Sequence, residues 1–260
     1  MQKLIKLLEN FRDFFPLDEV MKKSLLDFLH LKYNYNSNAI EGTTLTEGET
    51  AQVLRGETIP NHRLVEHFEV INHKKAFDFI LEKVNFFDEN KLDFLEIFTE
   101  KNILQIHKIL LTNISDDYAG IYRRQNVRIA FSKTILPNYL KVPDLMVNFF
   151  ADFGERYKNL DIKNYKEVLK FAYDLHLDFV KIHPFIDGNG RTARFIMNLW
   201  LLYSIKNINI IYFKNRQDYI EALEESSKNK RKYYDFMNKN FTEFKQDELE
   251  LLEKKEIFKY

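Results

Sequence analysis

Residues 183–194, HPFIDGNGRTAR, concentrate more chemically capable side chains than the rest of this chain. His183 can serve as a general base, and Asp187 can bind a divalent cation. Arg191 and Arg194 offer planar guanidinium groups that suit phosphate. Because the two arginines are three residues apart, a helix that begins near Arg191 would carry both on one face. The side chains predict a site for a phosphorylated anion.

The backbone of the same segment also favours an anion. Gly188 and Gly190 let consecutive N–H groups turn toward one point. The helix expected to follow them would add its N-terminal N–H groups and the positive end of its dipole. Asp187 alone would repel an anion, but Mg²⁺ can join one carboxylate to phosphate oxygens. We therefore expect a di- or triphosphate with Mg²⁺, and His183 beside it as general base.

Other interpretations fit parts of this segment. GNGRTA matches half of a dinucleotide-binding fingerprint, which needs a preceding strand, whereas the preceding residues have a helical period. His176 and His183 share a helical face and suggest a metal pair, but no H-E-x-x-H motif or third nearby ligand supports it, and a packed His176 is favoured. A plain helix–turn–helix, with Pro184 and glycine as breakers and surface arginines, stays open.

Helices must position the segment. Apolar residues recur at three- and four-residue steps through 165–182 and 192–206, as one face of a helix requires. Thr46 and Glu49 are spaced as a capping box. Helices are predicted over residues 2–15, 17–40, 47–55, 61–86, 91–113, 143–159, 165–182, 192–206, 216–227 and 229–257.

One stretch departs from the helical pattern. Residues 126–137, NVRIAFSKTILP, are rich in β-branched and aromatic residues with a polar pair in the middle, which predicts a short β-hairpin. An isolated hairpin is marginally stable, so it must lie against the helices.

Bulk composition narrows the class of protein. Lys plus Arg equals Asp plus Glu at 39 each, so no nucleic acid or anionic membrane partner is expected. The chain has no cysteine, which excludes disulfides and thiolate sites and suits a reducing cytoplasm. No apolar run is long enough for a signal peptide or a membrane span. A cytoplasmic location is the expectation.

The sequence resembles the Fic family. HPFIDGNGRTAR matches the family signature H-P-F-x-[D/E]-G-N-G-R-x-x-R at every specified position. The similarity extends to AGIYRR (119–124) followed by NVRI, which resembles the approach to the family's flap. NRQDYIEALEE (215–225) resembles the helix after the active loop, and SNAIEG (37–42) resembles the inhibitory motif [S/T]-x-x-x-E-[G/N]. Together these segments cover roughly residues 35–228.

The resemblance implies an all-α fold, a Fic helical bundle with a short β-hairpin flap. It divides the chain into an N-terminal helical extension with the inhibitory motif (1–60), a Fic domain (61–228) and a C-terminal helical tail (229–260). It also implies a protein adenylyltransferase, which transfers AMP from ATP to a Ser, Thr or Tyr hydroxyl of a target protein and releases pyrophosphate. ATP as substrate and Mg²⁺ follow from that activity.

Site roles also follow from the resemblance. His183 would be the base, Asp187 the Mg²⁺ ligand, and Arg191 and Arg194 the partners of the β- and γ-phosphates. The nucleotide-binding set would comprise Phe185, Gly188, Asn189, Gly190, Arg191 and Arg194, with Asn215 and Tyr219 near the adenine. The flap would pair with an extended stretch of the target through Arg128, Ile129, Ala130, Phe131, Ser132, Lys133, Thr134, Ile135 and Leu136.

The segment SNAIEG suggests a brake. Ser37 and Glu41 are one helical turn apart and share a face. The resemblance implies that Glu41 pairs with Arg194, withholds this cation from the γ-phosphate and so inhibits in cis. The alternative is that Gly42 simply ends a helix and Glu41 is an ordinary solvated acid.

Three other activities fit the same signature. The site could remove AMP from a modified protein, with Glu41 orienting a water; it could use another nucleotide donor; or the chain could be a non-catalytic nucleotide-binding module. The expected partner is a target protein with a hydroxyl side chain, and self-modification and a homodimer stay open. The sequence does not name the target.

Overall fold

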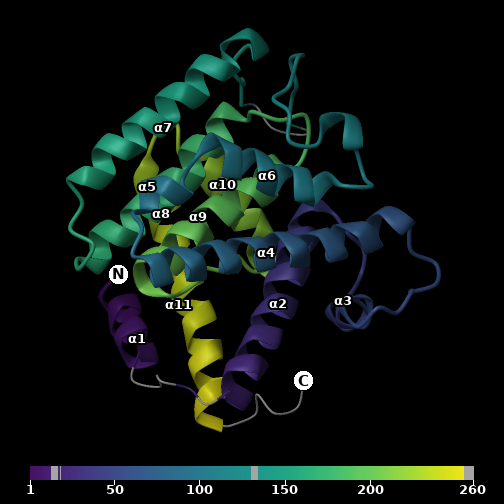
Figure 1. Cartoon of the computed structure of the whole chain (residues 1–260), viewed down its shortest axis with the longest axis vertical. Coiled ribbons are helices and arrows are strands. Elements are labelled where there is room, and N and C mark those ends of the chain that lie inside the picture. Colours follow the sequence, from purple (N-terminus) through teal and green to yellow (C-terminus); the bar gives the residue numbers. More distant parts are fainter. Residues whose placement is uncertain (13–16, 18, 130–133, 255–260) are drawn as a thin grey trace. The chain divides into compact units, whose positions relative to one another are not determined.

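The computed structural model consists of helices joined by loops and turns in the residues that it describes. No strand occurs in these ranges, so the all-α prediction is confirmed for them. Contacts divide the chain into two compact units: unit 1 comprises Met1–His62 and Asn209–Tyr260, and unit 2 comprises Arg63–Ile208 (Figure 1). The described residues are 1–12, 17, 19–129 and 134–254.

Unit 2 is built around one buried helix. In α9, every residue from Arg191 to Trp200 is buried, and the helix packs against α8, α4 and α6. The unit contains α4 (Leu64–Asn90), α5 (Phe94–Ile97), α6 (Glu100–Leu111), η1 (Asp116–Tyr118), η2 (Tyr139–Lys141), α7 (Val142–Lys158), α8 (Tyr165–Ile182) and α9 (Asn189–Ile205).

Trp200 joins α9 to its neighbours. Its indole Nε1 donates to the carbonyl of Val168 on α8 at 2.9 Å. Its ring lies edge-on to Phe94, with centroids 4.8 Å apart, and 4.6 Å from Phe171. A buried aromatic pair contributes about 0.5–1.5 kcal/mol beyond the area it buries. This cluster fixes α9, and with it the segment that leads into α9.

The predicted single helix over 91–113 is wrong, because the chain forms two capped helices, α5 and α6, with a break at Phe98 and Thr99. The Asp93 side chain accepts from Leu95 N at the start of α5. Thr99 then accepts from Asn102 N and starts α6. The backbone between them leaves the helical region at Phe98 (ψ 70°). Local caps of this kind compete with helix continuation.

Unit 1 combines the two ends of the chain. It contains α1 (Gln2–Arg12), α2 (Glu19–Glu41), α3 (Glu47–Leu54), η3 (Phe213–Asn215), α10 (Arg216–Glu225) and α11 (Lys230–Lys254). α11 packs against α1 and α10, and α2 packs against α3 and η3. The predicted capping box at Thr46 and Glu49 is confirmed at the start of α3. The domain boundaries drawn from the sequence stay a prediction.

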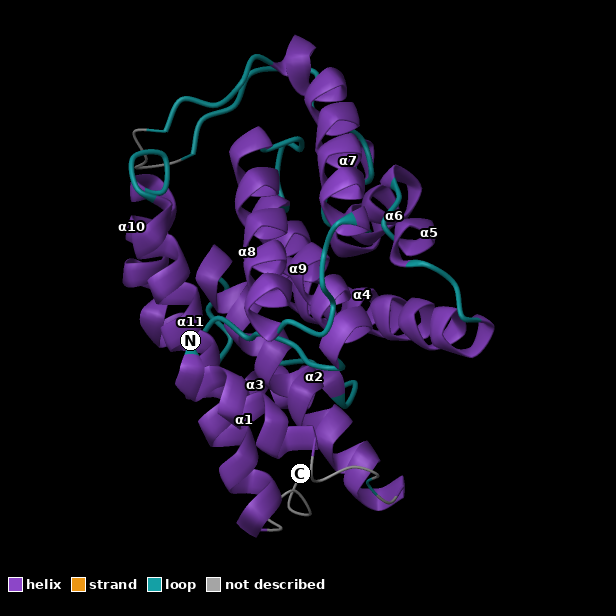
Figure 2. Ribbon diagram, turned by 90° about the vertical axis from the view of Figure 1, so that its left-hand side faces the viewer, coloured by secondary structure: helices purple, strands orange, loops and turns teal. Residues whose placement is uncertain are grey.

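The residues predicted to form a β-hairpin have irregular backbone wherever the structure describes them. Residues 124–129 and 134–138 contain neither strand nor helix and are drawn as loops in Figure 2. Tyr139 N donates to the Asn126 side chain at 3.0 Å, which ties the two arms at their base. Residues Ala130, Phe131, Ser132 and Lys133 lie outside the described residues, so the hairpin stays a prediction.

None of the helices in the described ranges is both long and apolar enough to cross a lipid bilayer.

Candidate functional site

His183 occupies an unusual backbone conformation at the end of α8. Its φ of 52° and ψ of 60° are left-handed, which costs about 1–2 kcal/mol for a residue with a side chain. Its N–H donates to the Phe179 carbonyl at 3.0 Å, and its ring Nδ1 lies 3.3 Å from the Val180 carbonyl. Because a carbonyl only accepts, this contact requires a proton on Nδ1. Nε2 of the neutral ring then carries the lone pair of a base.

Asn189 fastens the turn that follows His183. Its side-chain oxygen accepts from Phe185 N, and its side-chain nitrogen donates to Phe185 O, both at 2.9 Å. The Phe185 side chain is fully buried. The turn is therefore closed by hydrogen bonds on one side and anchored in the core on the other.

Gly188 begins α9. It is the N-cap residue, its φ is 73°, and no side chain caps the helix. A Cβ at this position would lie 3.3 Å from two atoms of the His107 ring, so both the conformation and the tight space favour glycine. The N-terminus of α9, including Gly190, thus presents backbone N–H groups and the positive dipole end without a side-chain cap.

Asp187 and Arg191 form the charged part of the loop. The Asp187 carboxylate accepts from Gly188 N at 2.6 Å and lies 3.6 Å from Arg191 Nη2. The Asp187 side chain is 65% exposed, whereas that of Arg191 is 2% exposed. Glu69 on α4 pairs with Arg191 Nη1 at 3.0 Å. This carboxylate holds Arg191 in place, and no pattern in the sequence predicts the contact, because the two residues are 122 positions apart along the chain.

Arg194 lies one turn further along α9 and is 1% exposed. His176 on α8 is fully buried, as the packed interpretation predicted. Burial, together with the positive charge of Arg194, lowers the pKa of His176 to about 3. Within the described part of the chain, no group of three or more His, Cys, Asp or Glu side chains is arranged to hold a metal. Arg191 and Arg194 both lie in unit 2, and both side chains are shielded from solvent.

The residues of the loop fit Mg²⁺ bound together with a phosphate. A cage made of protein ligands alone would need several carboxylates, and none of that kind is found among the described residues. Mg²⁺ usually takes one or two carboxylates and completes its shell with phosphate oxygens and water. The exposed Asp187 carboxylate beside the start of α9 matches that donor set.

His107 on α6 supports the loop that contains Asp187, and no pattern in the sequence predicts this role. Its Nδ1 accepts from Gly120 N, and its Nε2 donates to the Asp187 carbonyl, both at 2.9 Å. These partners require the neutral tautomer with a proton on Nε2. Burial lowers the pKa of His107 to about 4, although the bond to Asp187 opposes this shift. The spacing of 80 residues between donor and acceptor left no local signal for this contact.

In unit 1, the predicted inhibitory motif lies at the end of α2. Ser37 is 1% exposed, and Gly42 has a φ of 107°. Gly42 N donates to Ala39 O at 3.0 Å, and Thr43 N donates to Asn38 O at 3.2 Å. These two bonds form a Schellman motif. They end the helix directly after Glu41, so Glu41 lies at the C-terminus of α2.

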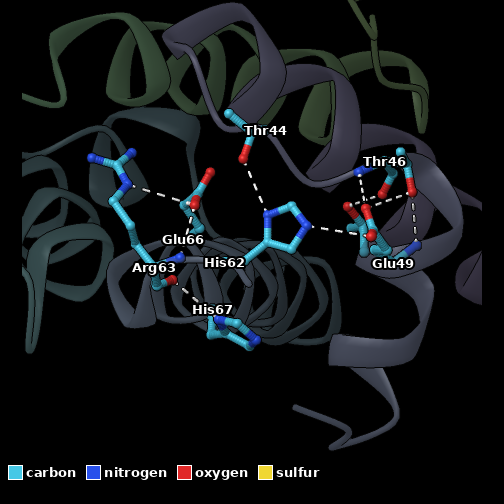
Figure 3. Close-up of polar contacts among 8 residues, drawn as sticks. Thr44, Thr46, Glu49, His62, Arg63, Glu66 and His67 are labelled. Carbon is cyan, nitrogen blue, oxygen red and sulfur yellow. Dashed lines mark hydrogen bonds and ion pairs between the residues drawn. The ribbon is translucent and has the colours of Figure 1, made fainter. Parts of the chain in front are cut away.

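The chain after the motif is fastened by a histidine. Figure 3 shows the His62 ring between Thr44 and Glu49. Nδ1 lies 3.1 Å from the Thr44 hydroxyl, and Nε2 lies 3.3 Å from the Glu49 carboxylate. Because Glu49 also accepts from Thr46 N at 2.8 Å, one carboxylate links the start of α3 to His62. The 43–46 turn is therefore held on both sides.

Asn215 and Tyr219 are engaged within unit 1. The Asn215 amide donates to Glu243 at 2.9 Å and lies 3.3 Å from Asn240 Oδ1. Tyr219 is 2% exposed, and its ring lies 5.8 Å from that of Phe236. Both predicted adenine contacts thus pack toward α11.

The described flap residues are mainly exposed. Ile135 is 95% exposed, Arg128 and Thr134 are exposed, and Ile129 and Leu136 are intermediate. An exposed apolar side chain this large offers contact area to another molecule.

Unit 2 is a helical unit in which the loop from His183 to Gly188 joins two packed helices, α8 and α9. This arrangement is the one to compare with known protein families. Residues 97–201 match the model of the Fic/DOC family. The chain therefore carries a Fic/DOC family domain, and the resemblance noted in the sequence is confirmed.

Known proteins of similar sequence carry the same family name. A protein of Nematostella vectensis named "Protein adenylyltransferase Fic" is 30% identical over 213 residues, which is 82% of this chain and 47% of the relative. "Protein adenylyltransferase fic-1" of Caenorhabditis elegans is 31% identical over 196 residues, which is 74% of this chain and 35% of that protein. The chain thus spans less than half the length of these relatives.

Solved structures share the fold. The structure of Fic-1 from C. elegans has a TM-score of 0.77 at 25% identity and matches 98% of this chain and 73% of that chain. A Fic domain-containing signalling protein from Bacteroides thetaiotaomicron has a TM-score of 0.78 at 22% identity, over 94% of both chains. The second likeness concerns the fold alone.

Proposed function

We propose that this chain is a protein adenylyltransferase that uses ATP and Mg²⁺. In the reaction, the oxygen of a protein hydroxyl attacks the α-phosphorus of ATP, and the bond between the α- and β-phosphates breaks. AMP stays on the target, pyrophosphate leaves, and His183 Nε2 takes the hydroxyl proton. Phosphoryl-type transfer depends chiefly on positioning and charge neutralisation.

The orientation of His183 carries this proposal. Its Nδ1 lies against the Val180 carbonyl, which leaves Nε2 as the basic nitrogen. The uncapped start of α9 follows five residues later. A base beside an anion-binding helix terminus suits attack by a substrate hydroxyl on a phosphate.

The remaining roles follow the order of the loop. Gly188, Asn189 and Gly190 receive phosphate oxygens through the backbone, with Phe185 as anchor. Arg191 meets the β-phosphate and Arg194 the γ-phosphate, while Asn215 and Tyr219 approach the adenine. Asp187 holds Mg²⁺. When bound, this ion neutralises phosphate charge.

Glu41 is proposed as a brake on this site. Its carboxylate pairs with Arg194 and competes with the γ-phosphate, so that ATP binds in an unproductive pose. The motif match and the position of Glu41 at the end of α2 support this proposal. A ligand, metal or partner that favours the open state would release the brake.

The target is proposed to dock as an extended segment on a flap formed by residues 128–136. Strand addition of this kind aligns a hydroxyl with the base. The exposure of Ile135 supports a docking role. The location is proposed to be cytoplasmic, which suits a chain without cysteine.

A labelling assay tests the proposed function. The Glu41→Gly chain is incubated with Mg²⁺ and ATP labelled in the α-phosphate, in the presence of a lysate and alone. Covalent label on a Ser, Thr or Tyr, found by mass spectrometry, supports AMP transfer. Parallel reactions with labelled GTP, CTP and UTP identify another donor. Release of AMP from a modified protein by the wild-type chain, without any transfer, would contradict the proposal.

A further inference from the structure

We propose that Arg123 is a positioning residue that couples the base of the 124–138 segment to His183. The inference rests on the proposed function, in which His183 acts as base and residues 128–136 within this segment receive the target. Arg123 lies in the loop between η1 and η2, and none of the roles assigned above involves it.

The contacts of Arg123 all go to backbone carbonyls. Its N–H donates to Pro184 O at 2.9 Å, and its Nε donates to His183 O at 2.8 Å. On the other side of the guanidinium, Nη2 donates to Pro137 O at 2.6 Å and Nη1 to Gln125 O at 3.2 Å. One buried side chain therefore joins the catalytic loop to both arms of the 124–138 segment.

The guanidinium of Arg123 is a buried cation, so hydrogen bonds must replace the water that it loses. Arg123 is 3% exposed, and within the described residues it has no carboxylate partner. Burial lowers the pKa of its guanidinium. Carbonyl dipoles alone balance its charge, including those just beyond the C-terminal end of α8, where a cation is favoured. The planar fork of arginine spreads its donors over three nitrogens, so that each reaches a different carbonyl.

The consequence concerns the left-handed backbone of His183. The orientation of the His183 ring depends on this φ of 52°, and the Nε of Arg123 holds the carbonyl of the same residue. If Arg123 is lost, the peptide can relax and the ring Nδ1 can leave the Val180 carbonyl. Movement of the arms at Gln125 or Pro137 reaches His183 through the same guanidinium.

The test compares three variants in the Glu41→Gly background. Arg123→Lys keeps the charge but has all its donors on one nitrogen, which cannot reach the three carbonyls that separate nitrogens of Arg123 bind. Arg124→Ala is the matched control, because Arg124 is the exposed neighbour. His183→Asn identifies the His183 signals among the seven histidines. For each variant, melting, kcat and KM for MgATP in AMP transfer, and the ring ¹⁵N spectrum are measured.

We expect Arg123→Lys to lower kcat by about 10- to 100-fold, as a small misplacement of a reacting group does, with little change in KM. Its His183 spectrum should change from the Nδ1–H tautomer to a mixture, while Arg124→Ala matches its parent in every readout. A folded Arg123→Lys with parental kcat and parental His183 tautomer would overturn the proposal. If the Glu41→Gly parent transfers no AMP but Arg123→Lys still changes the His183 tautomer, the proposed function is wrong. The coupling between Arg123 and His183 is supported in that case.

A measurement on the wild-type chain covers the case in which Arg123→Lys fails to fold. Native-state hydrogen exchange in rising urea gives the opening free energy of each amide. Arg123 N and His183 N are both hydrogen-bonded, and we expect them to open together with the same urea dependence. Separate openings of these two amides would refute the coupling.

Discussion

The ring of His107 lies flat on the ring of Phe185, with centroids 3.5 Å apart and an angle of 5° between the planes. Phe185 anchors the candidate loop in the core, and His107 bonds the Asp187 carbonyl two residues later. One side chain of α6 thus supports the loop by stacking and by a hydrogen bond. The neutral state of His107 is a condition for the hydrogen bond that its Nδ1 accepts from Gly120 N.

Acid should therefore destabilise the fold through His107. Its folded pKa is about 4, below the ordinary value of 6.5, so the unfolded chain binds more protons between these values. The free energy of unfolding must then fall as pH drops from 6.5 toward 4, and it should level off below pH 4. The expected loss is about 3 kcal/mol, at about 1.4 kcal/mol per pKa unit. Urea unfolding at several pH values measures this slope. His107→Gln should flatten it, leaving the contribution of His176; an unchanged slope would exclude His107 as its source.

Gly188→Ala should destabilise the protein by about 1–2 kcal/mol, since φ is positive and the added Cβ meets the His107 ring at 3.3 Å. Gly48→Ala is the matched control. Gly48 lies within α3 with nothing near its would-be Cβ, and alanine is favoured over glycine in helices. Thermal melts should show opposite signs for the two substitutions. Equal melting of Gly188→Ala and wild type would contradict the close packing at this position.

His183→Asn should abolish AMP transfer while the fold is retained. Asparagine tolerates the left-handed backbone better than alanine, so this variant separates the base from the strain. The loss expected for a missing general base is about 10²–10⁴-fold. Labelling measures transfer, and calorimetry checks that MgATP still binds. Near-normal transfer by His183→Asn or His183→Ala would remove His183 from its role as base.

Glu41→Gly should raise self-labelling by about 5- to 150-fold, the range of typical coupling free energies. Glu57→Gly, in an exposed loop of the same unit, should leave labelling unchanged. Adding Arg194→Ala to Glu41→Gly should remove the gain, because the γ-phosphate loses its cation. Equal labelling by wild type and Glu41→Gly would rule out the brake, and full activity of the double variant would rule out the role of Arg194.

Asp187→Asn should weaken the response to Mg²⁺. The amide oxygen can still accept from Gly188 N, but the negative charge is lost. A Mg²⁺ titration of AMP transfer should therefore shift to higher concentration by at least about tenfold. Asp117→Asn, an exposed acid in η1, is the control. Identical titrations for Asp187→Asn and wild type would exclude Asp187 as the ligand.

The sequence predicted most helices because the signals for helices are local. The helix predicted over 165–182 is confirmed as α8 (Tyr165–Ile182), and the capping box at Thr46 is confirmed. Repeats of three and four residues and caps act within one turn, so they can be read along the chain. The break between α5 and α6 was missed, because a continuous apolar period outweighed the caps at Asp93 and Thr99.

By itself, the sequence determined which side chains can do chemistry and in what order they follow one another from His183 to Arg194. It also determined the Fic/DOC resemblance, since that rests on one continuous string. What holds those side chains was decided only by tertiary structure: Glu69 beside Arg191, and the partners of Asp187 and His183 at separations of 80 and 60 residues. Such contacts form between distant segments, and their energy depends on burial, which no local spacing encodes.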